Sequence, residues 1–377
     1  MTLLSLSLAL AAEPSWTETL DRVTHAVVAV LFALAPTTLV RAANTATHPS
    51  SGVGGGDDNT VTGHYSLIAA GYGNEVNSHY SGILGGYSNL VQGDESSVLG
   101  GKTNFVNGSY SVVSGGERVS AYGSHSAAGG GYLNYARGDY SFIGSGRFQS
   151  SDGMFGAIAG GDSNRVRESY GFVGGGQLNI NRGEYGSIAG GQANTVAATQ
   201  ATIAGGYNNL ASGVGSTVGG GQANIASTTV AVVGGGSANS VSAVAGVVGG
   251  GTNNRVDTSH GVVAGGDDNH AGAYASAIGG GATNLGLSAY GVIAGGEENS
   301  NSGYASVVGG GESNAANAPY SGVCAGYSND NSGYGSAIGG GFENIVDNAP
   351  YGTLAGGLSN TINSLAGSVG GGSSNVA

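Results

Sequence analysis

The chain has 377 residues, 78 of them glycine, and carries a net charge of −13 with a pI near 4.7. Only 9 % of the residues are charged and no basic stripe is present, which excludes nucleic acid as the main partner. A single cysteine excludes an internal disulfide framework.

Residues 1–42 form a leader whose composition differs from that of the residues that follow. Its strictly apolar core is about ten residues long, short of the roughly twenty that a membrane-spanning helix needs. Val40 and Ala42 suit the small-residue rule of signal peptidase. We therefore expect a signal peptide that is cleaved after Ala42 or Ala43, with an uncleaved membrane anchor as the alternative. The mature chain, residues 43–377, is expected to have no membrane span.

A fifteen-residue repeat fills the chain from residue 43 onward. Counted from an asparagine in slot 1, the asparagine returns every fifteen residues from Asn44 to Asn344, and one inserted residue near Pro350 shifts the last units. Only Val119 and Gln149 replace the asparagine. A fixed period of this length indicates stacked structural units.

Three other slots show what one unit builds. Slot 13 is glycine in all 22 units that contain it, slot 10 is Val or Ile in 20 of 22, and slot 3 is Val, Ala or Ile in 18 of 23. Neighbouring glycines disfavour helices, because each costs about 1 kcal/mol in a helix interior, and collagen needs glycine at every third residue. Fifteen residues suffice for two strands of about five residues each and two tight corners. The sequence therefore predicts an all-β fold, a parallel β-solenoid of about 22 coils with slots 3 and 10 in its core.

The asparagine of slot 1 follows a glycine-rich corner. We expect it to adopt the left-handed conformation, which asparagine tolerates, and its amide to bond from coil to coil as a ladder. We interpret this row as structural first and as a ligand-binding row only second. Cys324 lies at slot 11, where Ala and Gly are usual, and is expected to act as a small residue.

Aromatic residues recur at slot 7 in the first units, at Tyr65, Tyr80, Tyr110 and Tyr140. Such rows cover the edges of coils by stacking, and they can also form a binding strip because tyrosine is enriched at contact surfaces. We favour packing for slot 7 and keep binding as the alternative.

The coils between residues 65 and 155 are the least regular, and slot 14 also carries aromatic residues there. A specific site needs a local departure from the repeat and rigid aromatic anchors. We therefore expect a protruding loop or ligand site in this segment. The candidate binding surface consists of Tyr72, Tyr87, Tyr132, Arg147 and Phe148.

Slot 9 becomes apolar beside slot 10 between residues 153 and 269, for example at Val232, Val247 and Val262. Both faces of this strand are then apolar, and the second face needs a partner surface. A glycine-rich coil also buries little apolar surface, so the free energy gained by burial is small compared with the conformational entropy lost on folding. We therefore expect a symmetric oligomer with slot 9 or slot 11 facing its axis.

From Ala271 onward the corners alternate between GGG and AGG, with Cys-Ala-Gly at 324–326 in place of one AGG, which marks a thirty-residue super-repeat. The units SAIGGG (276–281), SVVGGG (306–311) and SAIGGG (336–341), each followed by an asparagine, resemble the head repeats of trimeric autotransporter adhesins of the YadA type. The resemblance implies a left-handed β-roll that forms a homotrimer. It also implies adhesion at a bacterial cell surface, outer-membrane associated or secreted, with host cells, matrix proteins or other cells as partners.

No constellation of residues predicts catalysis or cofactor binding, so we expect neither an enzyme nor a bound cofactor. His64 and His79 share slot 6 in adjacent coils and should stack, but we interpret them as surface histidines and not as metal ligands. Acidic pairs at slots 14 and 15, such as Asp267 and Asp268, could collect Ca²⁺ weakly.

Three functional hypotheses follow from the sequence: an adhesin head, a purely structural extracellular rod, and an ice-binding solenoid. The third needs a flat row of outward threonines, whereas the threonines here are scattered, for example at Thr199, Thr217 and Thr229. The sequence does not decide between the first two.

Overall fold

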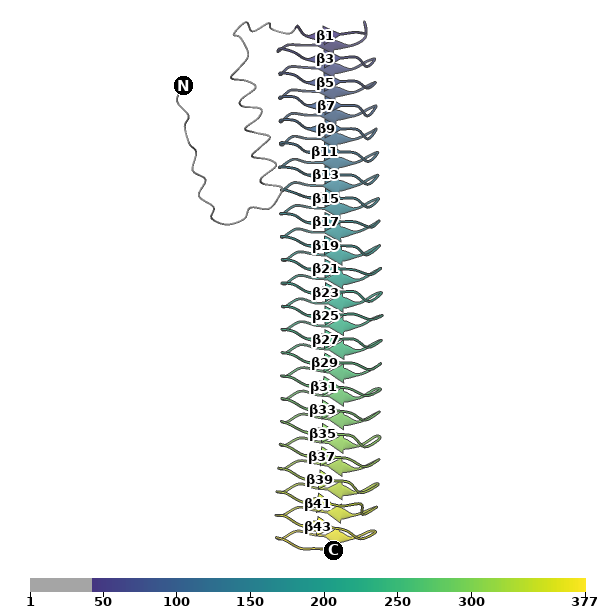
Figure 1. Ribbon diagram of the computed structural model, residues 1–377, viewed down its shortest axis with the longest axis vertical. Coiled ribbons are helices and arrows are strands. Elements are labelled where there is room, and N and C mark those ends of the chain that lie inside the picture. Colours follow the sequence, from purple (N-terminus) through teal and green to yellow (C-terminus); the bar gives the residue numbers. More distant parts are fainter. Residues whose placement is uncertain (1–42) are drawn as a thin grey trace, which may run out of the picture. The chain divides into compact units, whose positions relative to one another are not determined.

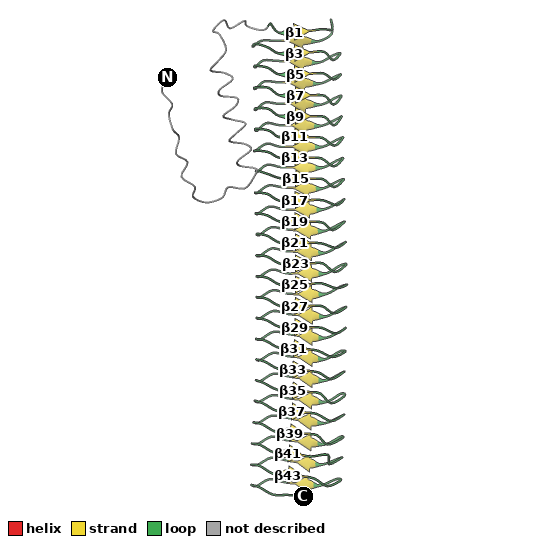
Figure 2. Ribbon diagram, in the orientation of Figure 1, coloured by secondary structure: helices red, strands yellow, loops and turns green. Residues whose placement is uncertain are grey.

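The repeat folds as a parallel β-solenoid in a computed structural model that describes residues 43–377 (Figure 1). Across this part of the chain there are 44 strands and no helix, with turns between the strands (Figure 2). Each unit makes one coil with two strands, and at about 4.8 Å per coil the stack extends about 100 Å. Of the two expected cleavage positions, Ala42 lies outside the described residues and Ala43 is exposed, so cleavage stays a prediction.

The strands occupy the same slots in every coil. The odd-numbered strands take slots 2 and 3, from β1 (Thr45–Ala46) in steps of fifteen residues to β41 (Ile345–Val346), and then β43 (Thr361–Ile362). The even-numbered strands take slots 9 and 10, from β2 (Gly52–Val53) in steps of fifteen to β40 (Ala337–Ile338), followed by β42 (Thr353–Leu354) and β44 (Ser368–Val369).

Successive coils pair in register, slot with slot. For example, β4 (Leu67–Ile68) pairs in parallel with β6 (Gly82–Ile83), which sets Ile68 opposite Ile83. In nearly every coil the backbone N–H groups of slots 2, 4, 9, 11 and 14 donate to carbonyls of the following coil at 2.7 to 3.2 Å. Because each residue is paired with its own equivalent, the side chains of one slot form a straight column.

Slots 3 and 10 fill the interior, as the sequence predicts. Ile68 and Ile278 at slot 10 are 0 % and 1 % exposed, and the equivalents along the chain form one continuous core. Burying one such side chain contributes about 1.5 to 3 kcal/mol. The asparagines at slot 3 find partners inside: Nδ2 of Asn301 donates to the carbonyl oxygens of Ser306 at 2.7 Å and Val292 at 3.2 Å. The buried hydroxyl of Ser151 has no hydrogen-bond partner among the described residues.

The glycine of slot 13 is required for two reasons at once. Gly281 has a φ of +88°, which lies in the left-handed region that favours glycine. A Cβ atom at this position would lie 2.0 Å from the carbonyl oxygen of Gly296 in the next coil. The invariance of slot 13 therefore follows from both the turn conformation and the close stacking of the coils.

The asparagine ladder is confirmed and lies inside the solenoid. The backbone N–H and the Nδ2 group of Asn299 are both 3.1 Å from Oδ1 of Asn284 in the preceding coil. The same Nδ2 donates to the corner carbonyls of Gly295 at 3.0 Å and Gly311 at 2.9 Å. The amide thus ties its own coil to the preceding one. Because the slot 1 side chains from Asn59 to Asn360 are buried, the row presents no surface to a ligand there.

Two local predictions were wrong. The strands are two residues long and not about five, because the corners take up most of each coil. The left-handed conformation expected at slot 1 instead occupies slots 15 and 7, as in Asp58 (φ +58°) and Tyr65 (φ +56°). The slot 1 side chain is needed in the interior, and the turn is therefore made by the residue before it.

The inserted residue near Pro350 is absorbed without breaking the stack. It lies in the turn between β41 and β42, where Ala349 is buried. The backbone N–H of Asn360 still donates to Oδ1 of Asn344 at 3.1 Å. A turn of the solenoid can therefore change length while the ladder continues.

Candidate binding surfaces

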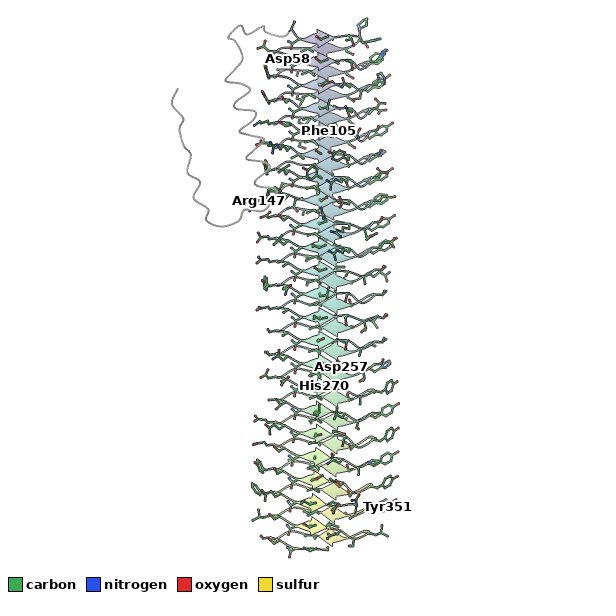
Figure 3. All side chains as sticks on the ribbon, in the orientation of Figure 1. Asp58, Phe105, Arg147, Asp257, His270 and Tyr351 are labelled. Carbon is green, nitrogen blue, oxygen red and sulfur yellow. The ribbon has the colours of Figure 1, made fainter. Side chains whose placement is uncertain are left out.

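Two edges of the solenoid carry most of the exposed aromatic side chains. We call them the slot-14 edge, formed by slots 13 to 15, and the slot-7 edge, formed by slots 5 to 7. Arg147 at slot 14 and Tyr351 at slot 7 lie on opposite edges (Figure 3). A row of parallel β-bridges runs along slot 14, from the pair of Asp57 and Tyr72 to the pair of Leu358 and Ser373. This third paired column was not predicted, and it holds the backbone of the slot-14 edge straight.

All five residues of the candidate binding surface lie on the slot-14 edge, but they do not form one cluster. Tyr72 and Tyr87 stack, with ring centroids 5.3 Å apart and planes 11° apart. Tyr132 meets Phe148 edge to face at 5.6 Å. The ion pair of Lys102 and Glu117, at 3.5 Å, lies between these two aromatic pairs.

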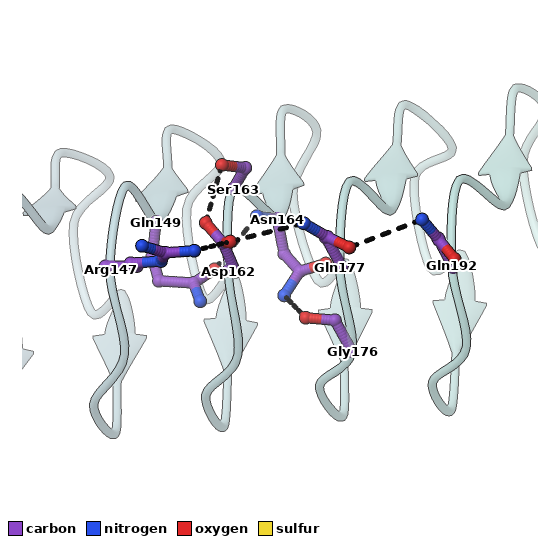
Figure 4. Close-up of polar contacts among 8 residues, drawn as sticks. All are labelled: Arg147, Gln149, Asp162, Ser163, Asn164, Gly176, Gln177 and Gln192. Atoms are coloured by element: carbon purple, nitrogen blue, oxygen red, sulfur yellow. Dashed lines mark hydrogen bonds and ion pairs between the residues drawn. The ribbon is translucent and has the colours of Figure 1, made fainter.

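Arg147 is bound to its neighbours along the same edge (Figure 4). Its Nη2 donates to Oδ2 of Asp162 at 2.7 Å. The side chains of Gln177 and Gln192 continue this chain of polar contacts over the next two coils, each at 3.3 Å. Partial burial works against ionisation of Asp162, but the hydrogen bonds from Ser163 and Arg147 outweigh it and lower the pKa of this carboxyl group. Arg147 therefore has its charge matched within the chain.

The two breaks in the asparagine ladder lie inside the solenoid. Val119 and Gln149 are 0 % exposed, and their coils keep the common register. Oε1 of Gln149 accepts the N–H of Asn164 at 3.0 Å, as an asparagine would, but its buried Nε2 has no hydrogen-bond partner among the described residues. The expected protruding loop is therefore absent from the coils that begin at Val119 and Gln149, because these two side chains face inward.

The slot-7 edge carries longer aromatic columns than the sequence interpretation identified. One column, here the stacked ladder, has ring centroids 4.6 to 5.0 Å apart and planes 7° to 18° apart. Its members are Tyr110, His125, Tyr140, Phe155, Tyr170 and Tyr185. Packing at slot 7 is thus confirmed for Tyr110 and Tyr140, and also for Tyr65 and Tyr80, which stack at 5.1 Å.

A second column on the slot-7 edge, here the zigzag ladder, alternates between slots 6 and 7. Its rings meet edge to face at centroid distances of 5.4 to 5.8 Å, with planes 66° to 85° apart. Its members are His260, Tyr274, Tyr290, Tyr304, Tyr320, Tyr334 and Tyr351. The signal in the sequence was an aromatic residue in every coil, which a search of slot 7 alone finds only in every second coil.

The predicted histidine pair is present, with a third histidine beside it. The rings of His64 and His79 are 4.9 Å apart and tilted, and His48 lies 3.4 Å from His64. Burial first, and then the charges of both neighbours, lower the pKa of His64. The backbone N–H of His64 donates to Nδ1 of His79 at 3.0 Å, so one nitrogen of that pair is already used. Within residues 43–377, no three His, Cys, Asp or Glu side chains come together as metal ligands.

A polar network lies on the outer face of the sheet that the odd-numbered strands form. Oδ2 of Asp257 lies 2.7 Å from Nε of Arg255 and 2.8 Å from Nε2 of His270. Its Oδ1 accepts a hydrogen bond from Ser242 at 2.9 Å. Partial burial disfavours ionisation of Asp257, but the hydrogen bonds from Arg255, Ser242 and His270 outweigh it and lower the pKa of this carboxyl group. The serine contacts the aspartate and not the histidine, so the group does not have the geometry of an activated nucleophile.

Comparison with known proteins gives no match to any protein-family model and none to a curated protein. The part of the chain that the structure describes holds no helix of the length and apolarity that a bilayer requires. The pairing of the strands shows a parallel β-solenoid with a fifteen-residue repeat, and no family is identified.

Proposed function

We propose that this protein is an adhesin head, exported to a bacterial cell surface or secreted, which attaches the cell to host cells, matrix proteins or other cells. The observation that carries the proposal is the exposure of aromatic rings along both edges of a stiff solenoid. Tyr65 and Tyr80 on one edge are 62 % and 63 % exposed, and Tyr72 on the other is 48 % exposed. Rigid aromatic side chains dominate the energetics of protein contacts.

The resemblance of the repeats to YadA-type heads supports the same proposal and suggests a homotrimer. The sheet of even-numbered strands offers a surface for such an assembly, because its outward slot 9 carries exposed apolar side chains. Val262, Val292 and Val307 are 37 %, 39 % and 45 % exposed, next to the small residues of slot 11. If three chains packed these faces around a common axis, the apolar side chains of slot 9 would be shielded from water.

The single cysteine allows the trimer to be tested. Cys324 is exposed at slot 11, on the proposed interface. A bifunctional maleimide should link pairs of chains through Cys324 at low protein concentration, and light scattering should give three times the mass of one chain. A monomeric mass without cross-linking would refute the trimer.

Attachment is tested with beads that carry the purified protein, counted on collagen, fibronectin, laminin and cultured epithelial cells. The double variant Tyr72→Ala, Tyr87→Ala should lower adherence about tenfold or more if the candidate surface holds a hot spot. Tyr207→Ala is the matched control, because Tyr207 lies at slot 14 with the same 48 % exposure, outside the candidate segment. If unmodified protein adheres to none of these surfaces, the structural-rod hypothesis takes the place of the adhesin.

A further inference from the structure

The zigzag ladder differs from the stacked ladder in what its rings leave uncovered. In the stacked ladder, nearly parallel planes cover one another. An edge-to-face contact uses the edge of one ring, so one ring of each pair in the zigzag ladder keeps its faces clear of that neighbour. The six tyrosines of the zigzag ladder are 45 % to 59 % exposed. This column therefore offers aromatic faces to a ligand, whereas the stacked ladder offers mainly edges.

The surroundings of the zigzag ladder from Tyr274 to Tyr334 are mostly polar, whereas the coils of its two ends carry Asp257 and Asp347 at slot 4. Slots 4 to 7 contain no charged residue from position 272 to position 335. Ser302, Asn317 and Ser332 follow one another at slot 4, two or three residues before the ring of the same coil. The carboxylate of Asp330, on the adjoining sheet, already accepts hydrogen bonds from Asn317 at 2.9 Å and Ser332 at 3.1 Å. Hydroxyl and amide groups next to aromatic faces suit a ligand that is rich in hydroxyl groups and has no charge.

The ladder also has a regular period. Tyr274, Tyr304 and Tyr334 lie at slot 6 and recur every thirty residues, that is, in every second coil. Two coils correspond to about 9.6 Å along the solenoid. This distance is close to the length of two pyranose units in an extended β-1,4-linked chain. The period therefore matches a straight polysaccharide whose repeating unit is a disaccharide.

We propose that the zigzag ladder, Tyr274 to Tyr351, is a binding platform for an extended, uncharged β-1,4-linked glucan, the chain of which cellulose is made. The apolar C–H faces of the sugar rings lie against the electron-rich faces of the tyrosines. The equatorial hydroxyl groups reach the serine and asparagine side chains of slot 4. The glucan chain runs parallel to the solenoid axis, so that each disaccharide meets an equivalent pair of coils and binding strengthens with chain length.

Other ligand classes fit this surface less well. An acidic polysaccharide or a nucleic acid needs cations, and from residue 256 to residue 377 there is no Lys or Arg. A protein partner does not require a fixed spacing of rings over six coils. This inference goes beyond the attachment proposed above, and it concerns a different edge from the candidate surface at slot 14.

The test measures glucan binding by the full purified chain. Cellohexaose is titrated calorimetrically, and hydroxyethylcellulose is included in native gels, where binding retards the protein. The variant Tyr304→Ala, Tyr334→Ala should bind at least tenfold more weakly, and Tyr304→Phe, Tyr334→Phe should stay within about threefold of the unmodified protein, because the ring carries the contact. The matched control, Tyr140→Ala, Tyr170→Ala in the stacked ladder, should bind as the unmodified protein does.

Four results would overturn the inference: no binding of cellohexaose by the unmodified protein, equal loss in the control, tighter binding of chitohexaose than of cellohexaose, or retardation only by carboxymethylcellulose. Circular dichroism melting curves establish that each variant is folded. Bead adherence is measured on the same variants. If the protein adheres to cells but does not bind the glucan, only the glucan-binding inference is refuted. If it binds the glucan but adheres to no cell or matrix protein, only the proposed adhesin function is refuted.

Discussion

Replacing Asn299 by valine should cost the solenoid about 3 kcal/mol of unfolding free energy. The substitution removes the donor to Asn284 Oδ1, Gly295 O and Gly311 O, and also the acceptor for two groups of Asn314, at 3.0 and 3.2 Å. Five hydrogen bonds at about 0.5 to 1.5 kcal/mol each come to roughly 5 kcal/mol. Burial of the valine side chain returns about 2 kcal/mol.

The assay is urea unfolding followed by far-ultraviolet circular dichroism, with thermal melting as a second measure. Val119 shows that the fold accepts valine in this slot, since its N–H still donates to Asn104 Oδ1 at 2.9 Å. The reverse change, Val119→Asn, should therefore stabilise the chain. Asn107→Val, at an exposed position, is the control and should change stability by less than about 0.5 kcal/mol. If Asn299→Val and Asn107→Val have the same effect, the asparagine ladder does not stabilise the stack.

The remaining predictions concern the core and a surface ion pair. Ile278→Asp should unfold the solenoid or dissociate its assembly, because Ile278 is 1 % exposed and an unpaired carboxylate would be buried there. Glu297→Gln, at the exposed slot-14 edge, should barely change the melting temperature. Equal effects of the two substitutions would mean that slot 10 does not face inward. Asp257 has a lowered pKa in the folded chain, so its contribution to stability is present above the ordinary aspartate pKa of about 3.9 and is lost as the pH falls through the lower folded value. Asp257→Asn should therefore lower the free energy of unfolding at pH 7 by less than about 1 kcal/mol, with a slightly lower melting temperature. The difference in melting temperature between the variant and the unmodified protein should disappear as the pH falls below 4. A difference that is constant with pH would contradict the role of the charge.

The architecture could be predicted because the repeat fixes it many times over. Ile68, Ile278 and their equivalents at slot 10 follow the alternation of a strand, and a shift by one residue would expose the whole column at once. The asparagine ladder could be predicted because an amide both donates and accepts hydrogen bonds and recurs at the same slot. The core column and the ladder both rest on local patterns that nearly every coil repeats.

The turn conformations could not be predicted in the same way. Leu133 and Val230 have φ values of +53° and +50°, although such side chains disfavour the left-handed region. The stacking of neighbouring coils imposes this conformation against local preference. The same holds for the candidate site, where Arg147 finds Asp162 only because slot 14 brings residues fifteen apart together.

The aromatic edges were recognised only in part. The stacked ladder includes His125 and Phe155, which continue the column of slot 7 tyrosines. The zigzag ladder alternates between two slots, so each slot examined alone shows a gap in every second coil. The thirty-residue super-repeat is visible in the glycine corners of the sequence, but the alternating edge-to-face contacts of the rings depend on how the coils stack.

The slot-with-slot register has a consequence for how the gene can change. A deletion or duplication of one whole repeat leaves each remaining residue paired with an equivalent, so the rod shortens or lengthens and still folds. Loss of a single residue within a strand turns its side chains to the opposite face, whereas the extra residue near Pro350 is tolerated because it lies in a turn. From residue 271 onward, loss of one repeat would bring two slot-6 or two slot-7 tyrosines together and interrupt the zigzag ladder. Natural length variants should therefore differ by fifteen residues in the first part of the chain and by thirty in the last.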